Sequence, residues 1–377
     1  MRLLHLADLH LGWAPRDLPV ALAEARQAAR DARLDEAVAL ALREGVDAVL
    51  IVGDLFERFD PSAALVRQVR TALSRLVAAG IAVVTVPGNH DELTYPASVY
   101  RREAQRWPGL LVREPMPAHV AQFDVAGEAL HVHAVAYVGG VTDVRDVLSQ
   151  LPPRGATGRH LFLAHGTLVH GAGDALEERS LPLPRAALAA AGYDYVALGH
   201  IHRPSQHRLG TSLVRYPGCV GGKGFDDPGA DAWTLVELSS SGVRIEERPH
   251  AGQRLRDLSL DVTPFDDAAA LEEALAAVLA NAAGDLVRLR LVGAAATLLD
   301  LATLEARCRG DVAYLRLEDR TNAVSEALLE AWASSPTVRG TFVRRLQERI
   351  AASHDPRERS ALVRALRYGL DAMAAEG

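Results

Sequence analysis

The strongest constraint on the fold is a set of five short polar motifs, each of which ends or directly follows a run of apolar residues. They read DLH, GDLF, GNHD, HG and GHIH and begin at Asp8, Gly53, Gly88, His165 and Gly199. The preceding runs are rich in Val, Leu, Ile and Ala, which is typical of buried strands. Because the carboxyl ends of parallel strands meet at one edge of a sheet, we expect the five motifs to converge there.

The side chains of these motifs are of the types that bind divalent metal ions. Asp8 and His10 are two residues apart, so on an extended chain they would share one face. The carboxylate of Asp54 has two oxygens and could bridge two ions. Each motif alone is equally explained by a strand-end turn, and a lone histidine such as His165 is more often structural. The complete set is therefore what predicts a metal site.

The third motif also suggests a catalytic group. The amide oxygen of Asn89 suits a divalent ion, whereas His90 beside it could face the substrate and protonate a leaving oxygen. Asp91 could then orient His90. The competing interpretation is a polar turn after a strand. In the last motif, His200 and His202 add two further imidazoles.

In this order, the motifs resemble the signature of the calcineurin-like metallophosphoesterases. The segments LADLHLG (6–12), VGDLF (52–56) and RYPGC (215–219) further resemble the SbcD branch of DNA-repair nucleases. The resemblance covers residues 1 to about 250 and implies a two-sheet layered α/β core flanked by helices. Two positions depart from it: Cys219 stands where many relatives have Ser, and Glu57 stands where some have His. Glu57 would make the substrate approach more acidic.

The resemblance also implies a site of two divalent ions, most readily Mn²⁺, that hydrolyses a phosphoester without a covalent enzyme intermediate. His90 would be the catalytic histidine outside the ligand set, with Asp91 beside it, and Asp54 would bridge the ions. The first ion would be held by Asp8, His10, Asp54 and His202. The second would be held by Asp54, Asn89, His165 and His200.

Three domains are expected along the chain. Residues 1–250 form the metallophosphoesterase domain, with an amphipathic helix over Val20–Arg43, a helix from Pro61 to about Ala79, and a second, more antiparallel sheet that takes in Trp233–Leu238 and Val243–Glu247. Residues 251–320 would form a small α+β cap domain that lines a DNA groove. Residues 321–377 would form C-terminal helices.

Two functions fit the motifs. The first is a two-metal DNA exonuclease or endonuclease that acts in double-strand-break or hairpin repair with an SbcC-like ABC-type ATPase, which the cap region favours. The alternative is a metallophosphoesterase for small substrates such as nucleotides, which the net charge of −7 mildly favours. A third interpretation, a scaffold with a degenerate site, is disfavoured because the ligand set is complete.

The remaining features concern partners and surroundings. Residues 337–377 carry eight arginines and five acids; these helices either pack on their own domain or dock to the ATPase. The resemblance also implies a homodimer, through Pro61–Leu76 or Tyr95–Trp107. We expect no membrane span and a cytoplasmic protein, with Cys219 and Cys308 as free thiols. Lys223 is the one lysine beside 40 arginines, which is typical of a GC-rich genome.

Overall fold

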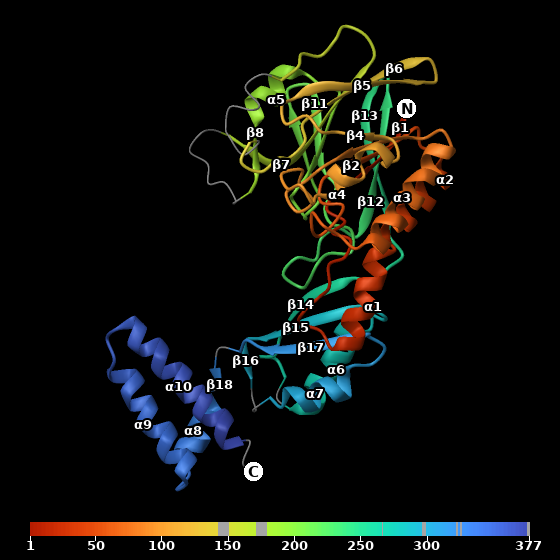
Figure 1. The fold of residues 1–377 in the computed structure, drawn as a ribbon. Coiled ribbons are helices and arrows are strands. Elements are labelled where there is room, and N and C mark those ends of the chain that lie inside the picture. The colour runs from red at the N-terminus through yellow and green to blue at the C-terminus, as the bar shows by residue number, and fades with distance from the viewer. Residues whose placement is uncertain are drawn as a thin grey trace. The chain divides into compact units, whose positions relative to one another are not determined.

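The apolar runs of the sequence form strands of two sheets in the computed structural model, which describes residues 1–141, 151–170, 179–265, 267–295, 299–321, 323–324 and 326–374. The chain divides into two compact units, Met1–Gly252 and Gln253–Gly377 (Figure 1). Both sheets belong to the first unit. In hydrogen-bonded order, the first sheet contains β13 (Gly242–Pro249), β12 (Ala232–Ser239), β1 (Arg2–Leu6), β2 (Ala48–Val52), β3 (Ala82–Val86) and β4 (Leu110–Leu111).

The second sheet carries the last two motifs. Its order is β10 (Ser205–Leu209), β11 (Ser212–Tyr216), β9 (Tyr195–Gly199), β7 (Arg159–Val169), β6 (Glu128–Ala134) and β5 (Ala118–Val125), and β8 (Leu181–Pro184) pairs with β7. The pairs β6–β7, β7–β9 and β9–β11 are parallel. The pairs β10–β11 and β5–β6 are antiparallel. The prediction that the second sheet is more antiparallel than the first was therefore wrong.

Strands β12 and β13 also lie elsewhere than predicted. They form a hairpin that joins the first sheet, where β12 pairs antiparallel with β1. The N-terminal amine of Met1 donates to the carbonyl oxygen of Leu238 at 2.9 Å. β2 pairs with one edge of β1, and β12 pairs with the other. Without β12, the backbone N–H and C=O groups along that edge would be unpaired.

Helices cover the outer faces of the two sheets. α1 (Val20–Asp31) and α2 (Arg33–Glu44) divide the predicted long helix at Ala32, and α3 (Ala63–Ala78) begins after Ser62, whose hydroxyl accepts from the N–H of Leu65 at 3.3 Å. Shorter helical segments are α4 (Val99–Arg102), η1 (Ala104–Arg106) and α5 (Arg185–Ala191). Leu188 of α5 packs in a separate cluster on the second sheet. The predicted two-sheet layered core flanked by helices is thus confirmed.

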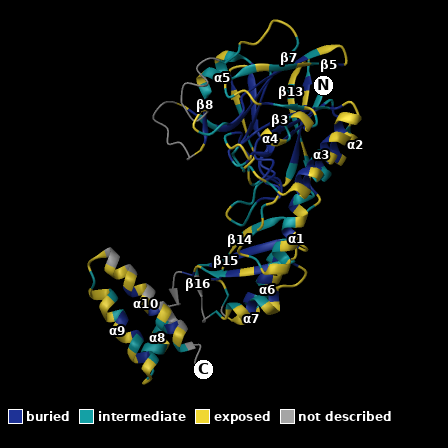
Figure 2. Ribbon diagram, viewed as in Figure 1, coloured by how far each residue is buried: buried dark blue, intermediate teal, exposed yellow. Residues whose placement is uncertain are grey.

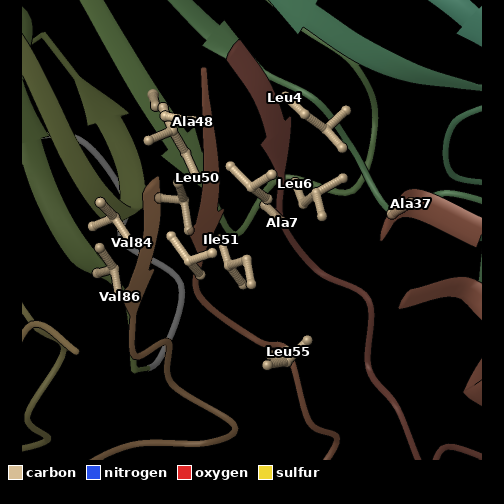
Figure 3. Close-up of a cluster of buried hydrophobic side chains, with 14 of the residues drawn as sticks. Leu4, Leu6, Ala7, Ala37, Ala48, Leu50, Ile51, Leu55, Val84 and Val86 are labelled. Atoms are coloured by element: carbon tan, nitrogen blue, oxygen red, sulfur yellow. The ribbon is translucent and has the colours of Figure 1, made fainter. Parts of the chain in front are cut away.

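The main core fills both faces of the first sheet. By strand register, Leu4 and Ile51 share one face, and Figure 3 shows them on the side of Ala37 from α2. Leu50 and Val84 share the opposite face, toward the second sheet. Figure 2 shows the consequence, with dark blue strands inside the first unit and yellow outer faces on α2 and α3. A sheet buried on both faces explains the near-continuous apolar runs of the sequence.

His5 is a polar side chain within this core, and it makes stability depend on pH. It is fully buried, its Nδ1 lies 2.8 Å from the hydroxyl of Tyr195, and burial lowers its pKa to about 3. The unfolded chain therefore takes up this proton near pH 6.5 and the folded chain does not, so stability falls as the pH drops from about 6.5 toward 3. At pH 5 we expect a loss on the order of 2 kcal/mol from this residue.

Urea unfolding of the wild type and of His5→Gln at pH 7.5 and pH 5 measures this loss. The variant should lose less stability than the wild type between the two pH values. Substitution of the exposed His354 by Gln is the matched control. Equal losses in wild type and His5→Gln would contradict the assignment.

The second unit has its own elements and cores. A parallel sheet contains β14 (Leu255–Asp261), β15 (Leu286–Val292) and β17 (Tyr314–Asp319), joined through α6 (Ala268–Leu279) and α7 (Leu301–Cys308), and β16 (Ala294–Ala295) pairs with β18 (Ala323–Val324). Helices α8 (Glu326–Ala333), α9 (Val338–Ala352) and α10 (Pro356–Ala374) follow, with a separate small core. The three-domain division stays a prediction. Across the described ranges, none of the helices is both long and apolar enough to cross a bilayer.

Candidate metal centre

The five motifs meet where the loops after β1, β2 and β3 run beside β7 and β9. The backbone N–H of Asp8 donates to the carbonyl oxygen of Gly53 at 3.1 Å, and that of His10 donates to Asp54 at 2.9 Å. The N–H of His200 donates to Oδ1 of Asp8 at 3.0 Å. Backbone hydrogen bonds therefore hold the first two motifs together, and the carboxylate of Asp8 ties them to the last motif, nearly 200 residues away in sequence.

One group of side chains surrounds the space between Asp8, His10 and His202, whose ligand atoms all lie within 4.8 Å of one another. Nε2 of His10 lies 3.0 Å from Nε2 of His202. Two imidazole nitrogens this close suit two ligands of a single ion, because an ion bound at about 2 Å from each brings them to such a separation.

A second group contains Asp8, Asp54 and His165, with the same limit on the separation of ligand atoms. Oδ2 of Asp54 lies 3.3 Å from Nε2 of His165 and 3.7 Å from Nε2 of His10. Oδ1 of Asn89 lies 3.0 Å from Nε2 of His165. Asp54 thus lies between the two groups, at the position that a bridging carboxylate would occupy.

His200 approaches the second group from the end of β9. Its Nδ1 lies 3.1 Å from Oδ1 of Asn89. All seven predicted ligand residues are therefore brought to one place, as the sequence predicts. His165 differs in its setting: β7 continues to Val169 through its pairing with β8, so this histidine lies within a strand and not beyond its end.

His90 lies at the rim of the same site. Its N–H donates to Oδ1 of Asp54 at 2.9 Å, and its Nδ1 lies 3.1 Å from the carbonyl oxygen of Glu57, to which it donates. That contact leaves Nε2 as the nitrogen that can face a substrate. The side chain is 35% exposed, whereas the side chain of His10 beside it is fully buried.

Asp91 makes contacts different from those predicted. It accepts from the N–H of Gly88 at 2.7 Å, from the N–H of Phe56 at 3.2 Å and from the hydroxyl of Tyr100 at 2.8 Å. Burial raises its pKa to about 6, and the nearby charge of Asp54 adds to the rise. The carboxyl of Asp91 therefore fixes the backbone of the loop that carries His90, and the predicted direct contact with the His90 ring is not formed.

The backbone angles single out some of the same residues, independently of the sequence motifs. Among the described residues, six other than glycine have positive φ, and four of them belong to the proposed ligand set: Asp8 (56°), His10 (47°), Asp54 (51°) and His200 (100°). Such backbone angles persist only where surrounding structure imposes them, and they cluster at functional sites. Asp8 and His10 converge through these turns and not, as predicted, by sharing a strand face.

Two glycines make room for the site. A Cβ added to Gly199 would lie 2.7 Å from Nδ1 of His165 and would overlap the carbonyl oxygen of Val52. A Cβ added to Gly88 would overlap the carboxylate of Asp54. The glycines of the GNHD and GHIH motifs are therefore required by close approach of the ligand side chains.

The electrostatics fit a cation. Burial raises the pKa of Asp8 to about 6. Burial alone would lower the pKa of His165, but Asp54 and Asp8 outweigh it and raise that pKa to about 9. The carboxylates thus attract positive charge strongly enough to hold a proton on a buried imidazole. A set of donors that combines oxygen atoms with imidazole nitrogens, close to negatively charged carboxylates, suits Mn²⁺, Fe²⁺ or Zn²⁺.

Three further residues touch the site and were not predicted as part of it. Oε2 of Glu57 lies 2.8 Å from Nδ1 of His10 and 2.8 Å from Nζ of Lys223. Oδ2 of Asp227 lies 2.5 Å from Nδ1 of His202. Glu57 was noticed in the sequence as a departure from the family, and Lys223 as the single lysine. Asp227, in a Gly-rich loop, gives no sequence signal of its own.

Comparison with protein families now identifies the first unit. The model of the calcineurin-like phosphoesterases matches residues 1–204. The chain belongs to this family. A calcineurin-like metallophosphoesterase is a hydrolase, and the seven predicted ligand residues and His90 lie within the matched region, whereas Lys223 and Asp227 lie beyond it.

Individual relatives are more distant. The chain is 24% identical to the "Uncharacterized metallophosphoesterase YhaO" of Bacillus subtilis (66% of this chain, 60% of that protein). It is 27% identical to the D subunit of the nuclease SbcCD from the same organism (63% and 66%). It is 26% identical to the "DNA double-strand break repair protein Mre11" of Thermoplasma acidophilum (57% and 55%). These alignments cover less than two thirds of each relative.

Proposed function

We propose that this metallophosphoesterase is a two-metal DNA nuclease that hydrolyses phosphodiester bonds. The observation that carries the proposal is the convergence of the seven proposed ligand side chains, with Asp54 between the two groups and His90 at the rim, outside the set. Manganese is the proposed ion. The first ion is assigned to Asp8, His10, Asp54 and His202. The second is assigned to Asp54, Asn89, His165 and His200.

When bound, two such ions supply Lewis acidity to the phosphate and activate water. The chain's own groups do the rest. The buried backbone contacts of Asp8 and Asp54 hold the carboxylates rigidly, so little reorganisation is needed during the reaction. The His90 side chain is 35% exposed, and its Nε2 is placed to donate a proton to the leaving oxygen or a hydrogen bond to the phosphate, while Nδ1 is engaged by the carbonyl oxygen of Glu57.

DNA as the substrate is supported by the names of two relatives, one a component of a nuclease and the other a double-strand break repair protein. The hydrolytic chemistry alone serves small phosphoesters equally well, and the relative YhaO carries no substrate in its name. A separate experiment therefore distinguishes DNA from a small phosphoester as the substrate.

The purified protein, loaded with Mn²⁺, should degrade linear duplex DNA and hydrolyse bis(p-nitrophenyl) phosphate, a diester, faster than p-nitrophenyl phosphate, a monoester. We expect a preference for the diester of at least about tenfold, equivalent to about 1.4 kcal/mol in the activation free energy. Release of acid-soluble nucleotides and of p-nitrophenolate measures both. Fast turnover of monoesters or nucleotides with intact DNA would favour the small-substrate alternative.

We propose that the C-terminal helices dock to an SbcC-like ABC-type ATPase. Val338 of α9 and Tyr368 of α10 are 80% and 69% exposed, which is unusual for apolar side chains of this size. Replacing both with Glu should reduce co-purification with the ATPase while leaving diester hydrolysis unchanged. Leu42→Glu on α2, at a position that is 37% exposed, is the matched control. Undiminished association of the double variant would contradict docking there.

The same proposal has four further parts. They are a homodimer, a DNA-groove role for the cap region 251–320, action in double-strand-break or hairpin repair, and a cytoplasmic location. Val77 of α3 is 45% exposed. If the dimer forms through Pro61–Leu76, Val77→Glu at the end of the same helix should shift the protein to the monomer in sedimentation analysis; if it forms through Tyr95–Trp107, this variant should stay dimeric.

A further inference from the structure

Lys223 is the only lysine among 41 basic residues of the chain, and it lies against the metal centre. Its Nζ is 2.8 Å from Oε2 of Glu57, and the two side chains are only 16% and 23% exposed. A solvent-facing position would accept arginine equally well, but this position is enclosed. We therefore look for a physical reason, in the surroundings of this position, why it carries a lysine and not an arginine.

The partner of Lys223 also contacts a proposed ligand. Oε2 of Glu57 lies 2.8 Å from Nδ1 of His10. A carboxylate only accepts, so a proton on Nδ1 of His10 would match this pairing and would leave the lone pair on Nε2. That Nε2 faces Nε2 of His202 at 3.0 Å, within the first proposed ion site.

The same arrangement occurs on His202. Its Nδ1 lies 2.5 Å from Oδ2 of Asp227. The backbone N–H of Lys223 donates to the carbonyl oxygen of Asp227 at 2.8 Å, and the N–H of Asp227 donates to Gly224 at 3.0 Å. A tight turn therefore fixes Lys223 and Asp227 relative to one another, while the ammonium of Lys223 fixes Glu57.

We propose that Glu57, Lys223 and Asp227 form a positioning triad that orients His10 and His202 so that both present Nε2 to one ion. This rests on the proposed two-metal site and deepens it by naming the residues that set the ligand geometry. Lys223 and Asp227 belong to none of the candidate ligand groups among the described residues; Glu57 forms such a group with His10 and His90, and the proposal gives it a positioning role instead. The three act through the outer nitrogens of two ligand imidazoles, an arrangement that raises ligand basicity and fixes the tautomer.

The surroundings explain why the cation is lysine. Nζ of Lys223 lies 5.7 Å from the centre of the Trp13 ring, and the guanidinium of Arg30 lies 5.0 Å from the same ring. Arg30 also reaches the carbonyl oxygen of Leu9 at 3.0 Å. We expect the compact ammonium of a lysine to suit the space between Glu57 and this group better than the wide planar fork of an arginine.

The test measures binding of Mn²⁺ to the full-length protein by electron paramagnetic resonance and titration calorimetry, without substrate. Lys223→Met should weaken one of the two binding steps by about 10–100-fold and leave the other within about threefold. Lys223→Arg should restore little of this loss. Glu103→Gln, which breaks the Arg70–Glu103 pair at 3.1 Å elsewhere in the unit, should change neither step.

If Lys223→Met does not fold, two variants of Glu57 test the same triad. Glu57→Gln retains an oxygen that accepts from His10 but loses the charge that holds Lys223, so its loss of affinity should be smaller than that of Glu57→Met. Wild-type affinity for both ions in Lys223→Met, or equal losses in the two Glu57 variants, would overturn the triad. If the wild type itself binds fewer than two Mn²⁺ ions, the proposed two-metal function fails instead.

Discussion

Replacing Asp54 with asparagine reduces Mn²⁺-dependent hydrolysis by about 10³-fold or more, the largest effect we expect from any single substitution. The loss corresponds to several kcal/mol of charge stabilisation in a two-metal site. The reason is position: Oδ2 of Asp54 lies between His165 at 3.3 Å and His10 at 3.7 Å, and Oδ1 accepts from the N–H of His90. An amide would place a neutral group where the charged carboxylate lies between the two groups.

The readouts are kcat for bis(p-nitrophenyl) phosphate and the rise in melting temperature on adding Mn²⁺. An ion at 100 times its Kd stabilises a folded protein by about 2.7 kcal/mol, so Asp54→Asn should show a smaller rise than the wild type. Asp60→Asn, which alters an exposed ion pair with Arg58, is the charge-matched control. Undiminished activity, or an equal rise in melting temperature, would remove Asp54 from the bridging position.

The convergence of the motifs was predictable because it depends on strand topology, which apolar patterning encodes. Parallel strands β1, β2 and β3 place their carboxyl ends together, and the first three motifs follow those ends. The pairing of β12 with β1 was not predictable in this way. A hairpin of alternating residues satisfies either sheet locally, and the choice depends on which strand edge is left open after the rest of the unit has folded.

The proposed ligand residues were predictable from the sequence to a greater extent than the residues that position them. Asp8 and His10 belong to a motif, but their approach through left-handed backbone depends on contacts with Gly53 and Asp54 far along the chain. Asp227 reaches His202 only through the fold of one loop. Residues that act through another side chain carry no spacing signal, because their geometry is fixed by tertiary contacts and not by a repeat.

Replacing His90 with glutamine separates chemistry from metal binding. The His90 ring is outside both groups around Asp54, and its Nδ1 is held by the carbonyl oxygen of Glu57 at 3.1 Å. We therefore expect both Mn²⁺ ions to bind with nearly unchanged affinity while kcat falls by about 10²–10⁴-fold, the usual contribution of a positioned acid–base group.

The measurement pairs Mn²⁺ stoichiometry with turnover of DNA and of bis(p-nitrophenyl) phosphate. Because p-nitrophenolate leaves readily without a proton, a general-acid role predicts a smaller loss for the aryl diester than for DNA; equal losses would indicate that His90 stabilises the phosphate instead. His119→Gln, an exposed histidine on β5, is the control. If His90→Gln loses an ion, the residue is a ligand, and if it retains full turnover on both substrates, it has no part in the reaction.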